Sequence, residues 1–150
     1  MQAPELHVGK TALVTGATSG IGFYTADALA RSGATVYITG RDASRAQAAV
    51  QHMRGASKND DVHFLKADAA TVGGNQYLAR RLLAETDRLH ILVNNVGGAY
   101  NDRWETADGY EATLAMDFVG PFALTHALLP LIQSSAPARI VNVASMSHAW

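Results

Sequence analysis

The stretch that decides the fold is Thr15-Gly16-Ala17-Thr18-Ser19-Gly20-Ile21-Gly22, which follows a short apolar run and leads into a segment of helical period. We expect Gly16 to allow a tight turn, Gly20 to let the backbone approach a pyrophosphate, and Gly22 to let helix and strand pack closely. The free N–H groups and the dipole of the helix start would then face the anion. Because the spacing is Gly-x-x-x-Gly-x-Gly rather than Gly-x-Gly-x-x-Gly, a glycine-rich turn without a ligand is the alternative.

Five short apolar runs alternate with longer segments of helical period along the chain. The runs are rich in Val, Ile and Leu without alternating polarity, as in strands buried on both faces, and comprise residues 12–15, 35–39, 62–65, 90–93 and 139–143. Four helices are expected between them, the first stopping before Gly33, the second capped by Asp42 and ending near Met53, and the longest over 106–133. This order predicts an α/β fold, a doubly wound, Rossmann-type parallel sheet of about five strands with the order 3-2-1-4-5.

Length and composition bound the class of protein. The 150 residues suit one domain, so we expect residues 1–150 to form a single unit. Lys plus Arg is 12 and Asp plus Glu is 13, and this balance gives no reason to expect nucleic-acid or membrane binding. The absence of Cys excludes a disulfide framework and a thiolate metal site, and it is compatible with the cytoplasmic location that we expect. The six His residues form no helical pair at i and i+4, so no metal site is predicted.

Arg41 follows the second predicted strand and lies nineteen residues beyond Gly22. A dinucleotide site needs a group here for the adenosine ribose, and an Arg accommodates the 2′-phosphate of NADP where an acid would accept from the 2′-hydroxyl of NAD. The neighbouring Asp42 is better placed to cap the next helix. The sequence therefore predicts NADP as cofactor, with an ordinary solvated Arg as the alternative for this position.

Three more motifs follow predicted strands in order. They are Lys66-Ala67-Asp68-Ala69, Asn94-Asn95-Val96-Gly97 and Arg139-Ile140-Val141-Asn142-Val143-Ala144-Ser145. Together with the glycine-rich turn they resemble the short-chain dehydrogenase/reductase family over essentially the whole chain from Gly9. The resemblance implies a cofactor site made of Gly16, Thr18, Ser19, Gly20, Ile21, Gly22, Arg41, Asp68, Ala69, Asn95, Val96 and Gly97. The segment 106–111 further resembles the retinol dehydrogenase-like branch. The alternatives are that Asp68 caps a turn and that the two Asn residues satisfy loop backbone groups.

The resemblance implies hydride transfer between NADP and a carbonyl or alcohol, with Ser145 polarising the substrate oxygen. A solvated turn is the alternative for Ser145. The family's Tyr-x-x-x-Lys pair would follow Ser145 by about a dozen residues, beyond Trp150, so the chain alone is predicted to be inactive. The alternative to the cofactor-binding part of an oxidoreductase is a nucleotide-binding or protein-interaction module that has no catalytic role.

The family's relay Asn is replaced by Asp117, whose side chain offers no amide. Pro121 lacks an N–H, which would leave the Asp117 carbonyl without its helical partner and able to bind a water. An Asp beside a Pro kink, without a catalytic role, is the alternative.

The predicted helix 106–133 has two apolar faces. One contains Tyr110, Leu114, Phe118 and Phe122, and the other Leu124, Leu128 and Leu131. The resemblance implies packing of this helix against its twin, so a homo-oligomer is expected. It also implies two further strands, so the sheet is expected to be incomplete at its carboxyl end, with the fifth strand as an open edge.

Overall fold

The computed structural model describes residues 6–145. Its strands are β1 (Thr11–Val14), β2 (Thr35–Gly40), β3 (Val62–Lys66), β4 (Ile91–Asn94) and β5 (Arg139–Asn142). Its helices are α1 (Gly20–Arg31), α2 (Ala43–Ser57), α3 (Val72–Glu85), α4 (Ala112–Leu114), the π-helix η1 (Ala115–Val119) and α5 (Gly120–Ser134).

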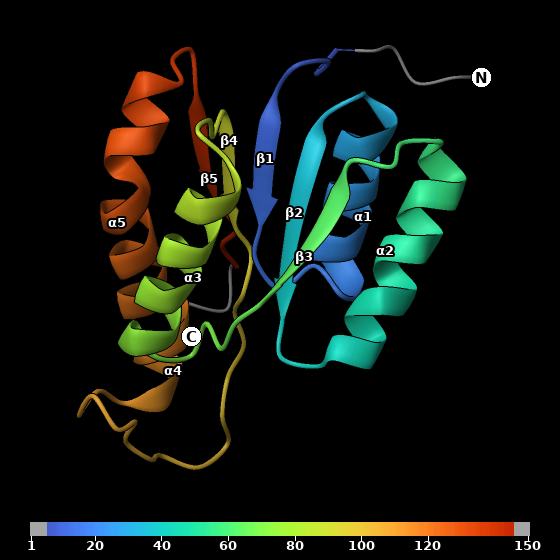
Figure 1. The fold of residues 1–150 in the computed structure, drawn as a ribbon. Coiled ribbons are helices and arrows are strands. Elements are labelled where there is room, and N and C mark those ends of the chain that lie inside the picture. Colours follow the sequence, from blue (N-terminus) through green and yellow to red (C-terminus); the bar gives the residue numbers. More distant parts are fainter. Residues whose placement is uncertain (1–5, 146–150) are drawn as a thin grey trace.

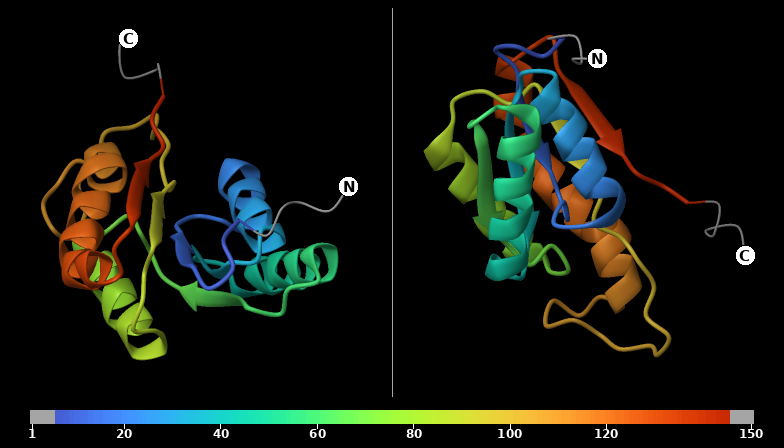
Figure 2. Two further views of the ribbon diagram at one scale, coloured as in Figure 1. Left: turned by 90° about the horizontal axis from the view of Figure 1, so that it is seen from above. Right: turned by 90° about the vertical axis from the view of Figure 1, so that its right-hand side faces the viewer.

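All five strands are parallel and form one sheet in the order β3-β2-β1-β4-β5. Helices α1 and α2 cover one face, and α3 and α5 cover the other (Figures 1 and 2). The predicted doubly wound α/β sheet and its strand order are confirmed. The observed strand boundaries differ from the expected ones by one residue at most ends.

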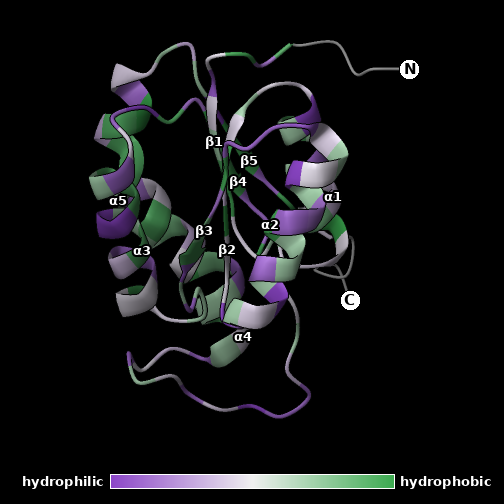
Figure 3. Cartoon of the chain, turned by 45° about the vertical axis from the view of Figure 1, so that its right-hand side comes forward, coloured by the Kyte–Doolittle hydropathy of each residue, from purple (hydrophilic) through white to green (hydrophobic). Residues whose placement is uncertain are grey.

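The strands lack alternating polarity because both faces of the sheet are covered. Leu13 packs with α3 and α5 in one apolar cluster, and its neighbour Val14 packs with α1 and α2 in the other. Both side chains are fully buried. Hydrophobic residues, green in Figure 3, therefore concentrate on the strands at the centre of the molecule.

The expected helix over 106–133 begins later than predicted. Residues 106–111 form a turn in which the N–H of Thr106 donates to the carbonyl of Tyr110, and Gly109 has a φ of +79°. The helix starts at Ala112, where the carboxylate of Glu111 accepts from two first-turn N–H groups. The apolar spacing extended past this cap because Tyr110 continues the four-residue period while lying outside the helix.

Local residues determine where α1 ends and where α2 begins. The first helix ends at Arg31 and Gly33 takes a φ of +89°, so the predicted stop is confirmed. Asp42 caps α2 through an oxygen that accepts from the N–H of Arg45 (3.0 Å), also as predicted. That helix runs to Ser57, four residues past the expected end at Met53.

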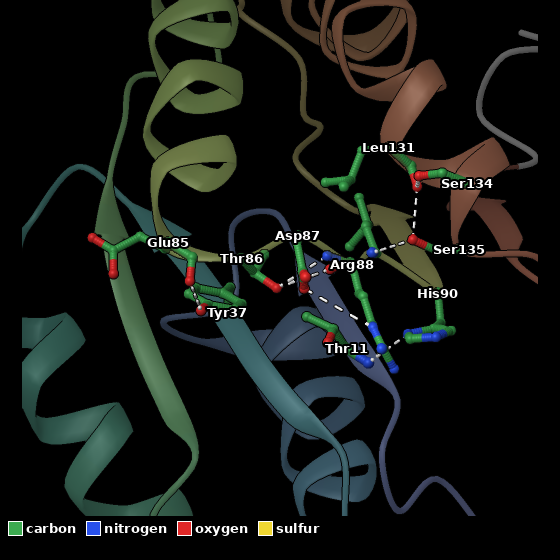
Figure 4. Close-up of polar contacts among 11 residues, drawn as sticks. Thr11, Tyr37, Glu85, Thr86, Asp87, Arg88, His90, Leu131, Ser134 and Ser135 are labelled. Carbon is green, nitrogen blue, oxygen red and sulfur yellow. Dashed lines mark hydrogen bonds and ion pairs between the residues drawn. The ribbon is translucent and has the colours of Figure 1, made fainter.

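At the amino ends of the strands, hydrogen bonds join β1 and the end of α5 to the turn before β4, and β2 to the end of α3 (Figure 4). The N–H of Thr11 donates to Nδ1 of His90 (2.9 Å), and the N–H of Leu89 donates to the hydroxyl of Ser135 (2.8 Å). Tyr37 donates to the carbonyl of Glu85 (3.5 Å). These bonds satisfy one backbone group each in β1, in the turn before β4 and at the end of α3.

The helical stretch 112–134 has one buried and one exposed side. Leu124 and Leu128 are buried in the cluster with α3, whereas Phe118 and Phe122 are each 65% exposed.

Among residues 6–145, Ala112–Ser134 is the one helix long and apolar enough to cross a membrane by length and composition, a test that core helices of soluble proteins also pass. Strand β5 is exposed along its whole length.

Candidate functional site

The glycine-rich turn lies at the carboxyl edge of the sheet, between β1 and α1. Gly16 has a φ of +63°, and a Cβ there would lie 2.8 Å from Cγ2 of Val96. Gly22 has no room for a Cβ, which would lie 2.7 Å from the carbonyl oxygen of Gly16. Gly20 has a φ of +59° and nothing within 4 Å of an added Cβ. Gly16 and Gly22 are thus required by packing, whereas Gly20 borders open space above the turn.

The start of α1 is not capped by a side chain. Ser19 occupies the N-cap in an extended conformation and its hydroxyl makes no capping bond. By contrast, Asp42 caps α2 and Thr71 caps α3 with side-chain oxygens. The first turn of α1 contains no acidic residue, so its N–H groups and the positive end of its dipole are available to an anion.

Two neighbouring residues complete this turn. Ile21 is 68% exposed in the first turn of α1, and Thr18 packs its methyl group against Gly40 at the end of β2. A ligand lying over the turn would contact the exposed Ile21 side chain.

Hydrogen bonds of Thr15 and Asn95 join the Asn94-Asn95-Val96-Gly97 segment to this turn. The hydroxyl of Thr15 accepts from the N–H groups of Asn95 (2.9 Å) and Val96 (3.1 Å). In return, Nδ2 of Asn95 donates to the carbonyls of Thr15 (2.9 Å) and Gly16 (3.3 Å). The structure therefore brings two predicted segments, eighty positions apart in sequence, into one rigid cradle.

Arg41 and Asp68 meet at a cavity of about 370 Å³ at the carboxyl ends of β2 and β3. One oxygen of Asp68 accepts from the N–H of Ala70 (3.1 Å), so the turn-capping alternative for this residue is observed. Its carboxylate nevertheless lines the cavity. Ala69, the remaining predicted residue of this segment, is buried and its carbonyl accepts from Nδ2 of Asn75 (2.9 Å).

Asp117 lies in the π-helix η1, where its Oδ1 accepts from the N–H of Gly98 (3.0 Å). The same oxygen would lie 3.3 Å from a Cβ on Gly97. Pro121 has no N–H to donate to the carbonyl four or five residues before it, which is where the helix adopts the wider turn. The Asp117 side chain thus fixes the loop after β4, and the binding of water by its carbonyl stays a prediction.

Ser145, the other predicted catalytic residue, follows β5 at the same carboxyl edge and is exposed. The expected Tyr-x-x-x-Lys position lies outside the described residues. Of the residues from 6 to 145, no three His, Asp or Glu side chains are grouped so that they could hold a metal ion.

Sequence reasoning missed the residues that hold the cradle together. The sequence motif includes Thr15 without predicting a role for its hydroxyl, and it assigns Thr39 to a strand alone; the Thr39 hydroxyl accepts from the N–H of Gly16 (3.1 Å). Asn94 donates to Oδ1 of Asn142 (2.8 Å) and to the hydroxyl of Thr125 (3.1 Å). A polar residue at the carboxyl end of an otherwise apolar strand was the available signal for Thr15, Thr39 and Asn142.

The sheet order, the glycine turn and the uncapped helix at the carboxyl edge define a Rossmann-type α/β protein. The sequence profile described as short chain dehydrogenase matches residues 10–149. The chain belongs to the short-chain dehydrogenase family, as the motifs predicted.

Curated relatives place the chain near retinol dehydrogenases. It is 43% identical over 140 residues to retinol dehydrogenase 12 of Bos taurus, covering 93% of this chain and 44% of that protein. It is 42% identical over 144 residues to polyprenol dehydrogenase of Mus musculus, covering 93% of this chain and 43% of that protein. The chain thus spans less than half the length of these relatives.

Solved structures agree with the fold. The NADP complex of RhlG from Pseudomonas aeruginosa superimposes with a TM-score of 0.82 at 33% identity, covering 97% of this chain and 58% of that chain. A short chain dehydrogenase from Escherichia coli complexed with NADPH gives a TM-score of 0.80 at 27% identity, covering 94% of this chain and 60% of that chain.

Proposed function

We propose that this chain forms the NADP-binding part of an oxidoreductase that acts on a carbonyl or alcohol substrate. The observation that carries the proposal is the start of α1 at Gly20, which no side chain caps. Gly20 has a positive φ, and the space beside it is open. A pyrophosphate needs such a concentration of free N–H groups without a competing carboxylate. The cradle made by Thr15 and Asn95 holds this turn in place before any ligand arrives.

The residues present fit the cofactor, with roles that follow from their positions. The backbone at Gly20, Ile21 and Gly22 would hold the pyrophosphate, Asp68 and Ala69 the adenine side, and Val96 and Gly97 the path toward the nicotinamide. When bound, the nicotinamide supplies the hydride acceptor or donor. Ser145 would orient the substrate oxygen by a hydrogen bond, and Asp117 would fix the loop after β4 through Gly98.

A preference for NADP over NAD rests on Arg41, which lines the cavity at the end of β2. A guanidinium binds a phosphate with two parallel hydrogen bonds, whereas the 2′-hydroxyl of NAD offers it no charge. The NADP and NADPH complexes of similar structures support this choice. The retinol and polyprenol in the names of the relatives make long apolar alcohols and their aldehydes the first substrates to test.

A second candidate is a nucleotide-binding or protein-interaction module without catalysis. It is favoured by the exposed Phe118 and Phe122. We propose self-association through this helical face in either case. A cytoplasmic location without nucleic-acid or membrane binding remains part of the proposal.

Calorimetric titration of the chain with NADPH and with NADH tests the proposed function. We expect NADPH to bind at least tenfold more tightly, and Gly20→Val to abolish binding because its side chain fills the space above the turn. Gly109→Val, at an exposed glycine with a φ of +79° and nothing within 4 Å of an added Cβ, is the matched control. Failure of both dinucleotides to bind would refute the proposal, and carbonyl reduction by the purified chain would exclude the module without catalysis.

A further inference from the structure

The cavity of about 370 Å³ at the carboxyl ends of β2 and β3 is lined by a second cation, Lys66, to which the sequence motifs assign no role. Its lining consists of Arg41, Lys66, Ala67, Asp68 and Tyr77. Lys66 is the last residue of β3 and is exposed, and it lines the same cavity as Arg41.

Strand pairing places the backbones of these two residues at neighbouring strand ends. Lys66 is the direct register partner of Gly40, and Arg41 is the next residue after Gly40. The N–H of Ala67 donates to the carbonyl of Gly40 (3.1 Å), which extends the pairing of the two strands to their carboxyl ends. The two residues therefore start from neighbouring strand ends on a hydrogen-bonded backbone, and the cavity that both line is the observation that brings them together.

Neither cation is neutralised by the protein over the described part of the chain. The four ion pairs within 4.0 Å involve Arg31, Arg81, Arg88 and Arg103. Of the acids nearby, Asp42 accepts from the N–H of Arg45 and Asp68 from the N–H of Ala70. Asp68 lines the same cavity but makes no ion pair within 4.0 Å with Arg41 or Lys66, so one acid faces two cations there and the local excess of positive charge favours the binding of an anion.

We propose that Lys66 acts with Arg41 as a two-cation clamp for the 2′-phosphate of NADP, and so determines cofactor specificity. This inference rests on the proposed function. A 2′-phosphate carries up to two negative charges, of which the planar guanidinium of Arg41 takes one edge in a bidentate manner. The ammonium of Lys66, a compact charge on a flexible stem, binds a remaining oxygen.

Binding of four probes to Lys66→Gln and Arg41→Gln tests the clamp by calorimetry. The probes are NADPH, NADH, 2′,5′-ADP and 5′-AMP, so the phosphate is varied with and without the nicotinamide. We expect Lys66→Gln to weaken NADPH and 2′,5′-ADP about tenfold, as for a lost hydrogen bond to a charged group. Its affinities for NADH and 5′-AMP should stay within about twofold of those of the unaltered chain.

Two control variants separate this role from a general charge effect. Lys66→Arg keeps the charge and should retain most of the NADPH affinity. Lys10→Gln removes the same charge at the opposite edge of the sheet and should change no affinity. If Lys66→Gln leaves the ratio of NADPH to NADH affinity unchanged while Arg41→Gln lowers it, the role of Lys66 is overturned and the proposed function stands. If the unaltered chain binds none of the four probes, both fail together.

Discussion

Replacing Thr15 by Val is the sharpest test of the cradle. Valine keeps the shape of this buried side chain, but it removes the oxygen that accepts from the N–H groups of Asn95 and Val96. Each partly buried N–H left without an acceptor costs about 1–3 kcal/mol, and partial exposure favours the lower end, so we expect a total loss of about 2–3 kcal/mol. For a domain of 150 residues this corresponds to a fall in Tm of about 5–10 °C.

Urea unfolding followed by circular dichroism measures this loss, with Thr15→Ser as the matched control. Serine retains the acceptor oxygen and loses only a methyl group, which costs about 1 kcal/mol. We expect the order of stability to be unaltered chain, Thr15→Ser, Thr15→Val, with equal m-values. A Thr15→Val protein within about 0.5 kcal/mol of Thr15→Ser would show that the two N–H groups find water, and the cradle would not be held by this hydroxyl.

Three further expectations concern other parts of the molecule. Gly16→Ala should lower stability by about 1–3 kcal/mol in urea unfolding, because it combines a positive φ with a Cβ 2.8 Å from Cγ2 of Val96. Burial, assisted by nearby Lys10, lowers the pKa of His90 below its ordinary 6.5, since its neutral Nδ1 accepts from Thr11. The contribution of neutral His90 to stability is therefore fully present above pH 6.5 and should be lost as the pH falls below it. His90→Gln should flatten that part of the plot of urea midpoint against pH. Phe122→Asp should lower the mass measured by sedimentation if this exposed face joins two copies.

Each of these three has an internal reference. Gly20→Ala shares the positive φ of Gly16 without a neighbouring atom within 4 Å, so it should cost less stability than Gly16→Ala. Equal losses would remove the argument from packing. An unchanged pH profile in His90→Gln would assign the acid loss to other groups. A Phe122→Asp chain that sediments like the unaltered chain would leave this face without a role in assembly.

The fold was predictable because its determinants are local in sequence. Runs of apolar residues, the stop at Gly33 and the cap at Asp42 each act within a few positions, and the structure has all of them. The start of the long helix was not predictable in the same way. Apolar spacing continued through Tyr110, and only the cap made by Glu111 and the turn at Gly109 interrupt it.

The site was predictable where a motif names the residue and not where tertiary contacts decide. The positions of Gly16, Gly20 and Gly22 follow from the turn they must make. The pairing of Thr15 with Asn95 depends on β1 and β4 lying side by side, which no short-range pattern encodes. The convergence of Lys66 with Arg41 likewise depends on strand register.

The strap between Thr15 and Asn95 also has a kinetic consequence. It joins residues eighty positions apart, and three helices and two other strands separate β1 from β4 in the sequence. Closing so large a loop costs entropy before any contact offsets it, and parallel pairing of distant strands is slow for this reason. We therefore expect the turn before α1 to be completed late in folding, and the appearance of dinucleotide binding during refolding to report the docking of β4.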